Sequence, residues 1–115
     1  MAKVSKAEYW QRGETIDLRN ETSVAIEENT VVVIGKRIGI TGMRIEPGEM
    51  GDLHVTGVFE FIKKSGEAIP VGSELLFDPA EGHITITETA GTVTAGFAAA
   101  TAAAEASGVL VKING

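Results

Sequence analysis

Residues 31–41 read VVVIGKRIGIT, and the class of fold can be worked out from this segment outward. Valine and isoleucine are branched at Cβ, which stiffens the side chain and suits a pleated strand better than a helix. The continuous apolar run 31–34 is typical of a strand covered on both faces or lying near the centre of a barrel. Gly35-Lys36 can turn tightly into the alternating run 37–41, so two antiparallel strands are predicted here.

The composition extends this pattern to the whole chain. Valine and isoleucine supply 22 of the 115 residues and threonine 11, whereas leucine supplies only 5. Fourteen glycines at short intervals divide the sequence into short segments. Other segments with strand patterns are 15–19, 23–26, 53–56, 58–62, 74–77, 83–87 and 109–113. We therefore predict an all-β fold, a small sandwich or barrel (jelly-roll-like) of about ten short strands.

Several local features of these segments can be tested directly. Residues 46–49, Glu-Pro-Gly-Glu, predict a type II turn, because proline presets φ at its second position and glycine accepts positive φ at its third. Alternation places Ile84 and Ile86 together on the inward face of one strand, and Val24 and Ile26 on that of another. The phenylalanines fall in strand patterns and are expected in the core. They are Phe59, Phe61, Phe77 and Phe97.

The alanine-rich segment 98–106 leaves two interpretations open. Alanine is the best helix former, so two turns of helix are one interpretation. Gly96 precedes the segment and Ser107-Gly108 follows it, and so short a helix is marginal alone. The surrounding periodicity favours a strand near Gly96, followed by an alanine-lined loop or a single helical turn.

Charge and cysteine content exclude several classes of function. Ten basic against 16 acidic residues give a net charge of −6, which repels phosphate backbones, so no nucleic-acid partner is expected. The basic pairs Lys36-Arg37 and Lys63-Lys64 are expected to be solvated turns rather than phosphate clamps. The absence of cysteine excludes disulfides, thiolate zinc sites and cysteine nucleophiles. No signal peptide and no apolar run of the roughly 20 residues that span a membrane are found, so no membrane partner and synthesis in a cytoplasm are expected.

Catalytic and cofactor patterns are also missing. Gly35-Lys36 lacks the hydroxyl and the helix of a phosphate-binding loop. His54 and His83 lie 29 positions apart with no close-spaced ligands, so they are expected to be surface histidines rather than a metal site. Glu27-Glu28 is expected to be a solvated turn. We therefore expect no enzyme, no metal and no cofactor.

The first twelve residues differ from the remainder. Tyr9 and Trp10 lie here among basic residues, and we interpret residues 1–12 as an N-terminal arm leading into a single β-rich domain, 13–115. An arm has little reason to carry tryptophan unless something buries the ring. Two interpretations stay open: Trp10 plugs the end of its own barrel, or it docks on a partner.

An ordered set of glycine-centred motifs runs through the chain. They are Gly13-Glu14-Thr15-Ile16, Gly48-Glu49, Gly57-Val58-Phe59-Glu60, Lys63, Gly72, Leu76-Phe77-Asp78, Gly96-Phe97-Ala98 and 109–115. Their order resembles the small capsid cement, or decoration, proteins of tailed bacteriophages, over roughly residues 10–115.

This resemblance implies a structural, non-enzymatic role. Such a protein binds the outer surface of the icosahedral head and stabilises contacts between subunits of the major capsid protein. It would associate with itself, as a homodimer or homotrimer, and reside on the virion after synthesis in the host cytoplasm. Tyr9, Trp10 and Arg12 would then lie at the interface with the capsid or with another copy.

Two other classes of function remain to be weighed. A small β-barrel module that binds a glycan or another small ligand is one alternative, although a sugar site normally needs a cluster of exposed aromatic and amide side chains. An enzyme would need a deep pocket in which His54 or His83 converges with carboxylates.

Overall fold

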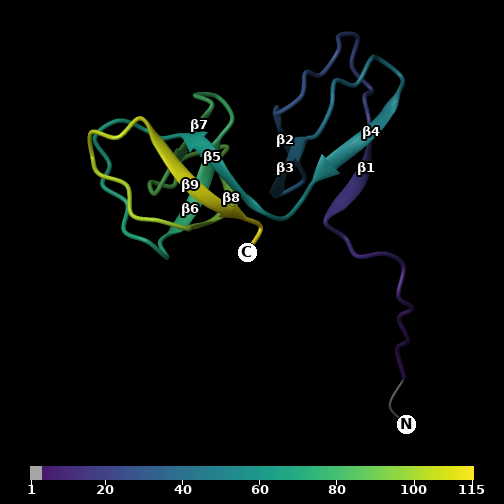
Figure 1. The fold of residues 1–115 in the computed structure, drawn as a ribbon, viewed down its shortest axis with the longest axis horizontal. Helices are drawn as coiled ribbons and strands as arrows, with labels where there is room; N and C mark the ends of the chain where they lie inside the picture. The colour runs from purple at the N-terminus through teal and green to yellow at the C-terminus, as the bar shows by residue number, and fades with distance from the viewer. Residues whose placement is uncertain (1–3) are drawn as a thin grey trace.

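The computed structural model describes residues 4–115, which form nine strands and no helix. The strands are β1 (Thr15–Arg19), β2 (Val31–Ile34), β3 (Arg37–Thr41), β4 (Met50–His54), β5 (Val58–Ile62), β6 (Glu74–Asp78), β7 (His83–Thr85), β8 (Val93–Ala98) and β9 (Gly108–Ile113). They form two antiparallel sheets, ordered β1-β4-β3-β2 and β5-β9-β8-β6-β7, which lie side by side in Figure 1. The all-β prediction is confirmed, with nine strands instead of about ten.

Segment 31–41 forms the predicted hairpin. Val31 lies opposite Ile40, and a two-residue turn with φ of 61° at Gly35 joins β2 to β3. The expectation that 31–34 is covered on both faces is wrong. β2 is an edge strand that pairs only with β3, and Val33 is partly exposed.

The turn predicted at residues 46–49 is also present. The Glu49 N–H donates to the Glu46 carbonyl oxygen at 3.0 Å, and Gly48 has a φ of 81°. Positive φ at the third position is the requirement of a type II turn.

One core joins the two sheets. Ile38 and Ile40 of β3 pack with buried residues of the five-stranded sheet, and Asn114, after β9, donates its side-chain N–H groups to the carbonyl oxygens of Ile38 and Val55 at 2.8 and 2.9 Å. A sandwich agrees with this packing, whereas the barrel is not closed. Strands that follow one another in the chain stay within one sheet, so the connections do not alternate between sheets as in a jelly roll.

The four-stranded sheet has a small buried centre of its own. Leu53 and Ile45 are buried there because each covers a glycine. A Cβ on Gly39 would lie 2.4 Å from Leu53 Cγ, and one on Gly51 would lie 2.5 Å from Ile45 Cγ1. Glycine at these two positions lets both side chains lie flat on the sheet.

Three expectations about inward-facing side chains are wrong. Ile86 is 45% exposed, because β7 ends at Thr85 and the Ile86 N–H turns to the Glu67 carboxylate. Val24 is 66% exposed, since its segment forms only an isolated bridge between Ile26 and Ile45. Phe97 is also exposed, whereas Phe61 and Phe77 are buried and Phe59 packs at the edge of the core.

The alanine-rich segment is a loop, as the surrounding periodicity favoured. Ala102 pairs with Ile69 in an isolated antiparallel bridge, with both N–H to O=C distances at 2.8 Å. These long-range bonds give the alanines partners that a helix would have provided locally.

Lys63 departs furthest from expectation. It is 4% exposed instead of lying in a solvated turn, and its Nζ donates to the carbonyl oxygens of Lys64, Glu67 and Ala104 at 2.8, 2.6 and 3.1 Å. Because a buried ammonium must have its donors satisfied, this lysine ties the loop after β5 to the alanine segment.

Candidate interaction surface

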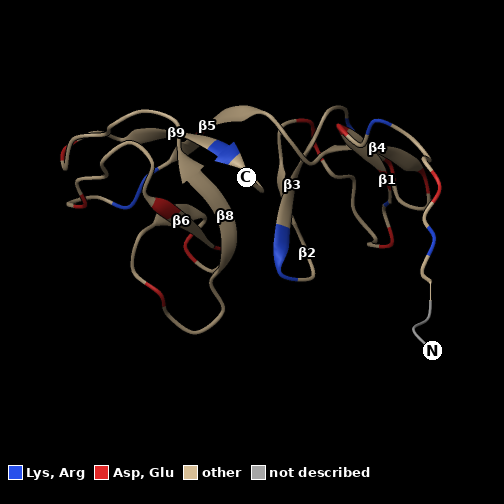
Figure 2. Cartoon of the chain, turned by 90° about the horizontal axis from the view of Figure 1, so that it is seen from below, with Lys and Arg blue, Asp and Glu red and all other residues tan. Residues whose placement is uncertain are grey.

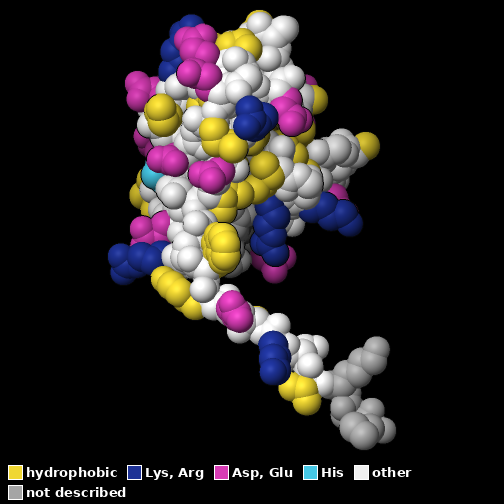
Figure 3. All heavy atoms as spheres, turned by 90° about the vertical axis from the view of Figure 1, so that its right-hand side faces the viewer, with side chains coloured by type: hydrophobic (Ala, Val, Ile, Leu, Met, Phe, Trp, Pro, Cys, Tyr) yellow, Lys and Arg dark blue, Asp and Glu magenta, His cyan; other side chains and the backbone are white. Residues whose placement is uncertain are grey.

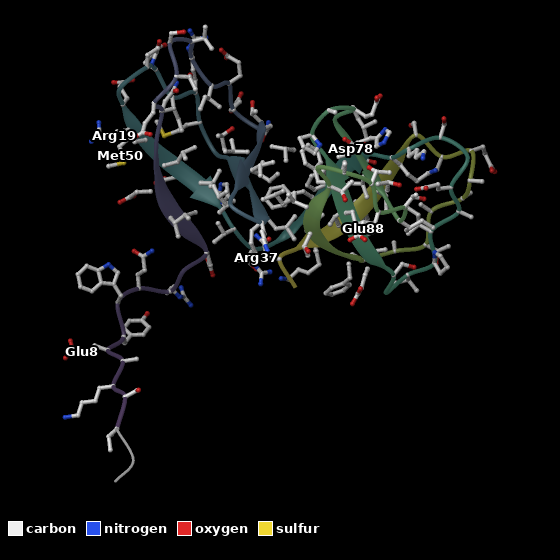
Figure 4. All side chains as sticks on the ribbon, turned by 180° about the vertical axis from the view of Figure 1, so that it is seen from behind. Glu8, Arg19, Arg37, Met50, Asp78 and Glu88 are labelled. Atoms are coloured by element: carbon white, nitrogen blue, oxygen red, sulfur yellow. The ribbon has the colours of Figure 1, made fainter. Side chains whose placement is uncertain are left out.

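The N-terminal arm lies apart from both sheets. Residues 4–12 form no strand and are exposed, with Trp10 89% and Tyr9 82% exposed. Figure 3 shows the arm leaving the body as a tail, and Figure 4 shows Glu8 well away from Arg37 in the body. Trp10 therefore does not plug the end of a barrel formed by its own chain, and the interpretation that a partner covers it remains.

Local structure explains where the arm leaves the body. It precedes β1, an edge strand that pairs only with β4. Gly13 has a φ of 80° with open space around it, so the chain can change direction before the strand begins. The one hydrogen bond described for an arm side chain runs from Gln11 Nε2 to the Thr15 carbonyl oxygen at 3.1 Å.

Arm and body carry opposite charge. Residues 1–12 contain three basic side chains and one acidic, a net charge of +2, whereas residues 13–115 contain 7 basic and 15 acidic, a net charge of −8. Figure 2 shows acidic residues distributed over both sheets and their loops. The arm is therefore attracted to the surface of its own protein or to any other acidic surface.

A groove of about 430 Å³ lies where the two sheets meet. One wall comes from the β2–β3 hairpin, through Val31 and Ile40, and the other comes from β5, through Phe59 and Phe61. Ile40 and Phe61 are buried and make the floor apolar. Glu60 and Ile62 are exposed at the rim, and Asn29 and Gly82 complete the lining.

The groove exists because the five-stranded sheet curls without closing. β5 and β7 are its two edges, and they meet only at the parallel bridge between Lys63 and Ile84. The rest of the β5 edge stays open. Sequence alone indicated a strand with inward phenylalanines at 58–62, but it held no signal that this strand would be an edge beside the other sheet.

The remaining sequence candidates do not form a reaction site. His54 and His83 are both half-buried, not fully exposed, and they belong to different sheets; the His54 ring lies 6.1 Å from that of Phe59. Within residues 4–115, no three His, Asp or Glu side chains are grouped as a metal site requires. The same residues contain no helix long and apolar enough to cross a membrane.

Carboxylates at two places in the structure stabilise loops instead. The Arg44 guanidinium bonds Glu46 and Glu27 at 2.7 and 2.6 Å, which raises the pKa of Arg44 further. Partial burial opposes ionisation of Glu67, but hydrogen bonds from the Ile86 N–H and from the hydroxyls of Thr87 and Thr85 lower its pKa below the ordinary value. Glu67 thereby stays charged and holds its loop to β7.

Comparison with known proteins adds a single line of evidence. A family model described as "Phage cement protein" matches residues 10–113. A search of curated proteins and a search of solved structures each found no match to the chain.

Proposed function

The chain belongs to the phage cement protein family, and we propose that it binds the outer surface of an icosahedral phage head and stabilises contacts between major capsid protein subunits. The observation that carries this assignment is the family match over residues 10–113. The exposed arm carries an aromatic pair and basic side chains that are not buried against the body, so they can attach the protein to a partner.

Within this proposal the chain divides into two parts. Residues 1–12 are the arm, and 13–115 form a single cement domain that associates with itself as a homodimer or homotrimer. Tyr9, Trp10 and Arg12 form the interface with the capsid or with another copy. The exposure of Tyr9 and Trp10 supports this assignment, because large aromatic side chains in water gain most when a partner covers them.

The mechanism needs no chemistry. Each bound copy adds contact area that must be broken before two capsid subunits can separate. Many weak contacts act together, because a copy anchored at one point faces its second site at high effective concentration. A chain without cysteine makes these contacts through burial and hydrogen bonds, which do not depend on the redox state of the surroundings. We accordingly propose that the protein is not an enzyme and requires no cofactor, nucleic acid or membrane.

The test is binding to phage heads that lack cement protein. Purified full-length protein should co-sediment with such heads and saturate at a fixed number of copies per capsid subunit. Decorated heads should also withstand a higher temperature before releasing DNA than undecorated ones. Binding that rises without saturation, or saturation with no gain in head stability, would contradict the cement role.

One alternative has a place in the structure. The groove between the sheets falls in the volume range of small-ligand sites, so a glycan or another small ligand could occupy it. Its lining contains one amide, Asn29, and one carboxylate, Glu60, which is sparse for a sugar. A thermal-shift screen against a glycan panel decides: a saturable increase in Tm that is lost in Phe59→Ala would favour this function.

A further inference from the structure

The open edge of β5 pairs with β7 only at its end, through the bridge between Lys63 and Ile84, and no strand among the described residues pairs with the rest of it. Two hydrogen bonds at the ends of the β5–β9 pair show which residues of β5 bond to β9. The Ile113 N–H donates to the Gly57 carbonyl oxygen, and the Lys63 N–H donates to the Ser107 carbonyl oxygen. Peptide groups alternate in direction along an antiparallel strand. The backbone N–H and C=O groups of the odd-numbered residues of β5 therefore point toward β9, and those of the even-numbered residues point away from it. The residues that face away are Val58, Glu60 and Ile62.

This edge lacks the usual protection against pairing. Natural edge strands are blunted by charged side chains, by a covering segment, and above all by lysine and proline, and the one charge on β5 is Glu60. β5 contains neither lysine nor proline, and Val58 and Ile62 are among the most exposed apolar side chains of the body, at 54% and 68%. The apolar groove runs along the same strand. A short extended segment could therefore pair with the edge and bury a large side chain beside it.

The arm has the properties that this site requires. Residues 4–12 give nine residues of chain, whereas β5 has five, so a paired strand leaves several residues as a connector. In an extended conformation side chains alternate, so one face carries Lys6, Glu8, Trp10 and Arg12, with a net charge of +1. Among the described residues the groove lining contains Glu60 and no Lys or Arg. In the sequence, Glu28 and Glu81 adjoin the lining residues Asn29 and Gly82, and Lys63, whose Nζ is held by carbonyl oxygens, adjoins Ile62. A basic aromatic arm therefore meets an acidic, apolar groove.

The arm and the groove lie at opposite edges of the four-stranded sheet. The arm enters through β1, and the groove begins at β2, with β4 and β3 between them. In the described chain the arm extends away from both sheets (Figure 4). This placement favours the groove of a neighbouring copy over that of the arm's own chain.

We propose that residues 4–12 of one copy add to the open edge of β5 in a second copy, as an extended strand that places Trp10 in the groove between the sheets. Reciprocal exchange of arms closes a dimer, and exchange in one direction around a ring closes a trimer. In either assembly every β5 edge is paired. The inference rests on the self-association in the proposed function, and it names the segment and the surface that produce it.

Trp10 is the only tryptophan, so its fluorescence reports the position of the arm. Sedimentation equilibrium and emission spectra should be recorded on the full-length protein over a wide concentration range, without phage heads. The mass should rise from monomer to dimer or trimer, and the emission should move to shorter wavelength over the same range, because the indole leaves water.

Two variants test whether the β5 edge and its groove bind the arm of the second copy. Ile62→Pro removes an open-edge N–H without removing a bond to β9, and proline is tolerated on edge strands. Glu60→Arg reverses a charge at the groove, and Glu74→Arg, at an exposed position on β6, is its control with the same net charge. Ile62→Pro and Glu60→Arg should each raise the dissociation constant of self-association about tenfold or more, whereas Glu74→Arg should leave it nearly unchanged.

The outcomes separate this inference from the cement role. A monomer at every concentration overturns it, and a short-wavelength emission from that monomer shows that the arm binds its own chain. Self-association that survives Glu60→Arg unchanged overturns the assigned groove, and this variant decides if Ile62→Pro fails to fold. Heads that bind a strictly monomeric protein would overturn the inference and leave the cement function intact.

Discussion

Replacing Trp10 by alanine should affect binding far more than folding, and the size of the difference follows from exposure. Trp10 is 89% exposed, so only about 11% of its surface contacts the protein. A tryptophan offers at most about 250 Å² to bury. At about 25 cal/mol per Å², its contacts within the chain contribute roughly 0.7 kcal/mol at most. For a domain of this size, that corresponds to a decrease in Tm of about 5 °C or less.

The expected effect on binding is larger. A tryptophan buried at the centre of an interface typically costs about 2–4 kcal/mol when it is truncated. At about 1.4 kcal/mol per factor of ten, the dissociation constant for heads should rise roughly 30-fold to 1,000-fold. Removing residues 1–12 should have at least the same effect, because it also removes Tyr9 and the basic side chains.

The two quantities are measured on the same preparations. Co-sedimentation with undecorated heads, at a series of protein concentrations, gives the dissociation constant, and thermal denaturation followed by circular dichroism, at concentrations at which the protein is monomeric, gives Tm. Val71→Ala is the matched control, because it truncates an exposed apolar side chain in the body. Comparable losses in affinity and stability for Trp10→Ala would refute the reasoning, since they would place the ring in the core. So would an affinity equal to that of the control.

Three further predictions concern the body. Lys63→Met should lower the free energy of unfolding by about 2–4 kcal/mol in urea titrations, because the partly buried carbonyl oxygens of Lys64 and Glu67 lose their Nζ donor and that of Ala104 keeps only the Gly66 N–H; a loss below about 1 kcal/mol, or one equal to that of exposed Lys36→Met, would contradict this. Glu67→Gln should cost about 1–2 kcal/mol at pH 7. Because the pKa of Glu67 lies below its ordinary 4.5, the charged form stabilises the fold above that pH. The deficit of the variant should therefore shrink as the pH falls below 4.5, and a deficit constant from pH 7 to pH 3 would exclude this origin. Gly96→Ala should abolish soluble expression or cost more than about 3 kcal/mol, since a Cβ would lie 1.9 Å from the Lys112 carbonyl oxygen; Gly91→Ala, at positive φ in open space, should cost only about 1 kcal/mol.

The features that were predicted correctly depend on near neighbours in the chain. The hairpin at 31–41 requires only apolar strands and a glycine that accepts positive φ between them. The turn at Gly48 follows in the same way from a proline and a glycine side by side. Steric restrictions on φ and ψ act over one or two residues, so a local sequence states them fully.

The features that were missed depend on partners far away in the chain. Lys63 has a charged side chain and was expected in solvent. Ala104, 41 residues later, supplies one of the carbonyl oxygens that allow it to be buried. Ile86 continues an alternating pattern, yet the Glu67 carboxylate captures its N–H and ends the strand. Neither partner can be identified from periodicity, because periodicity describes one strand at a time.

The sequence by itself determined that this protein is built from β-strands, where its sharpest turns lie, and that a basic aromatic arm precedes an acidic body. Only the tertiary structure decided that the strands separate into two sheets, that the five-stranded sheet stays open at β5, and that Trp10 lies outside the core. The physical reason is the range of the interactions. Strand and turn preferences are set by adjacent residues, whereas an edge, a groove and an uncovered side chain are defined by what the rest of the chain leaves unpaired.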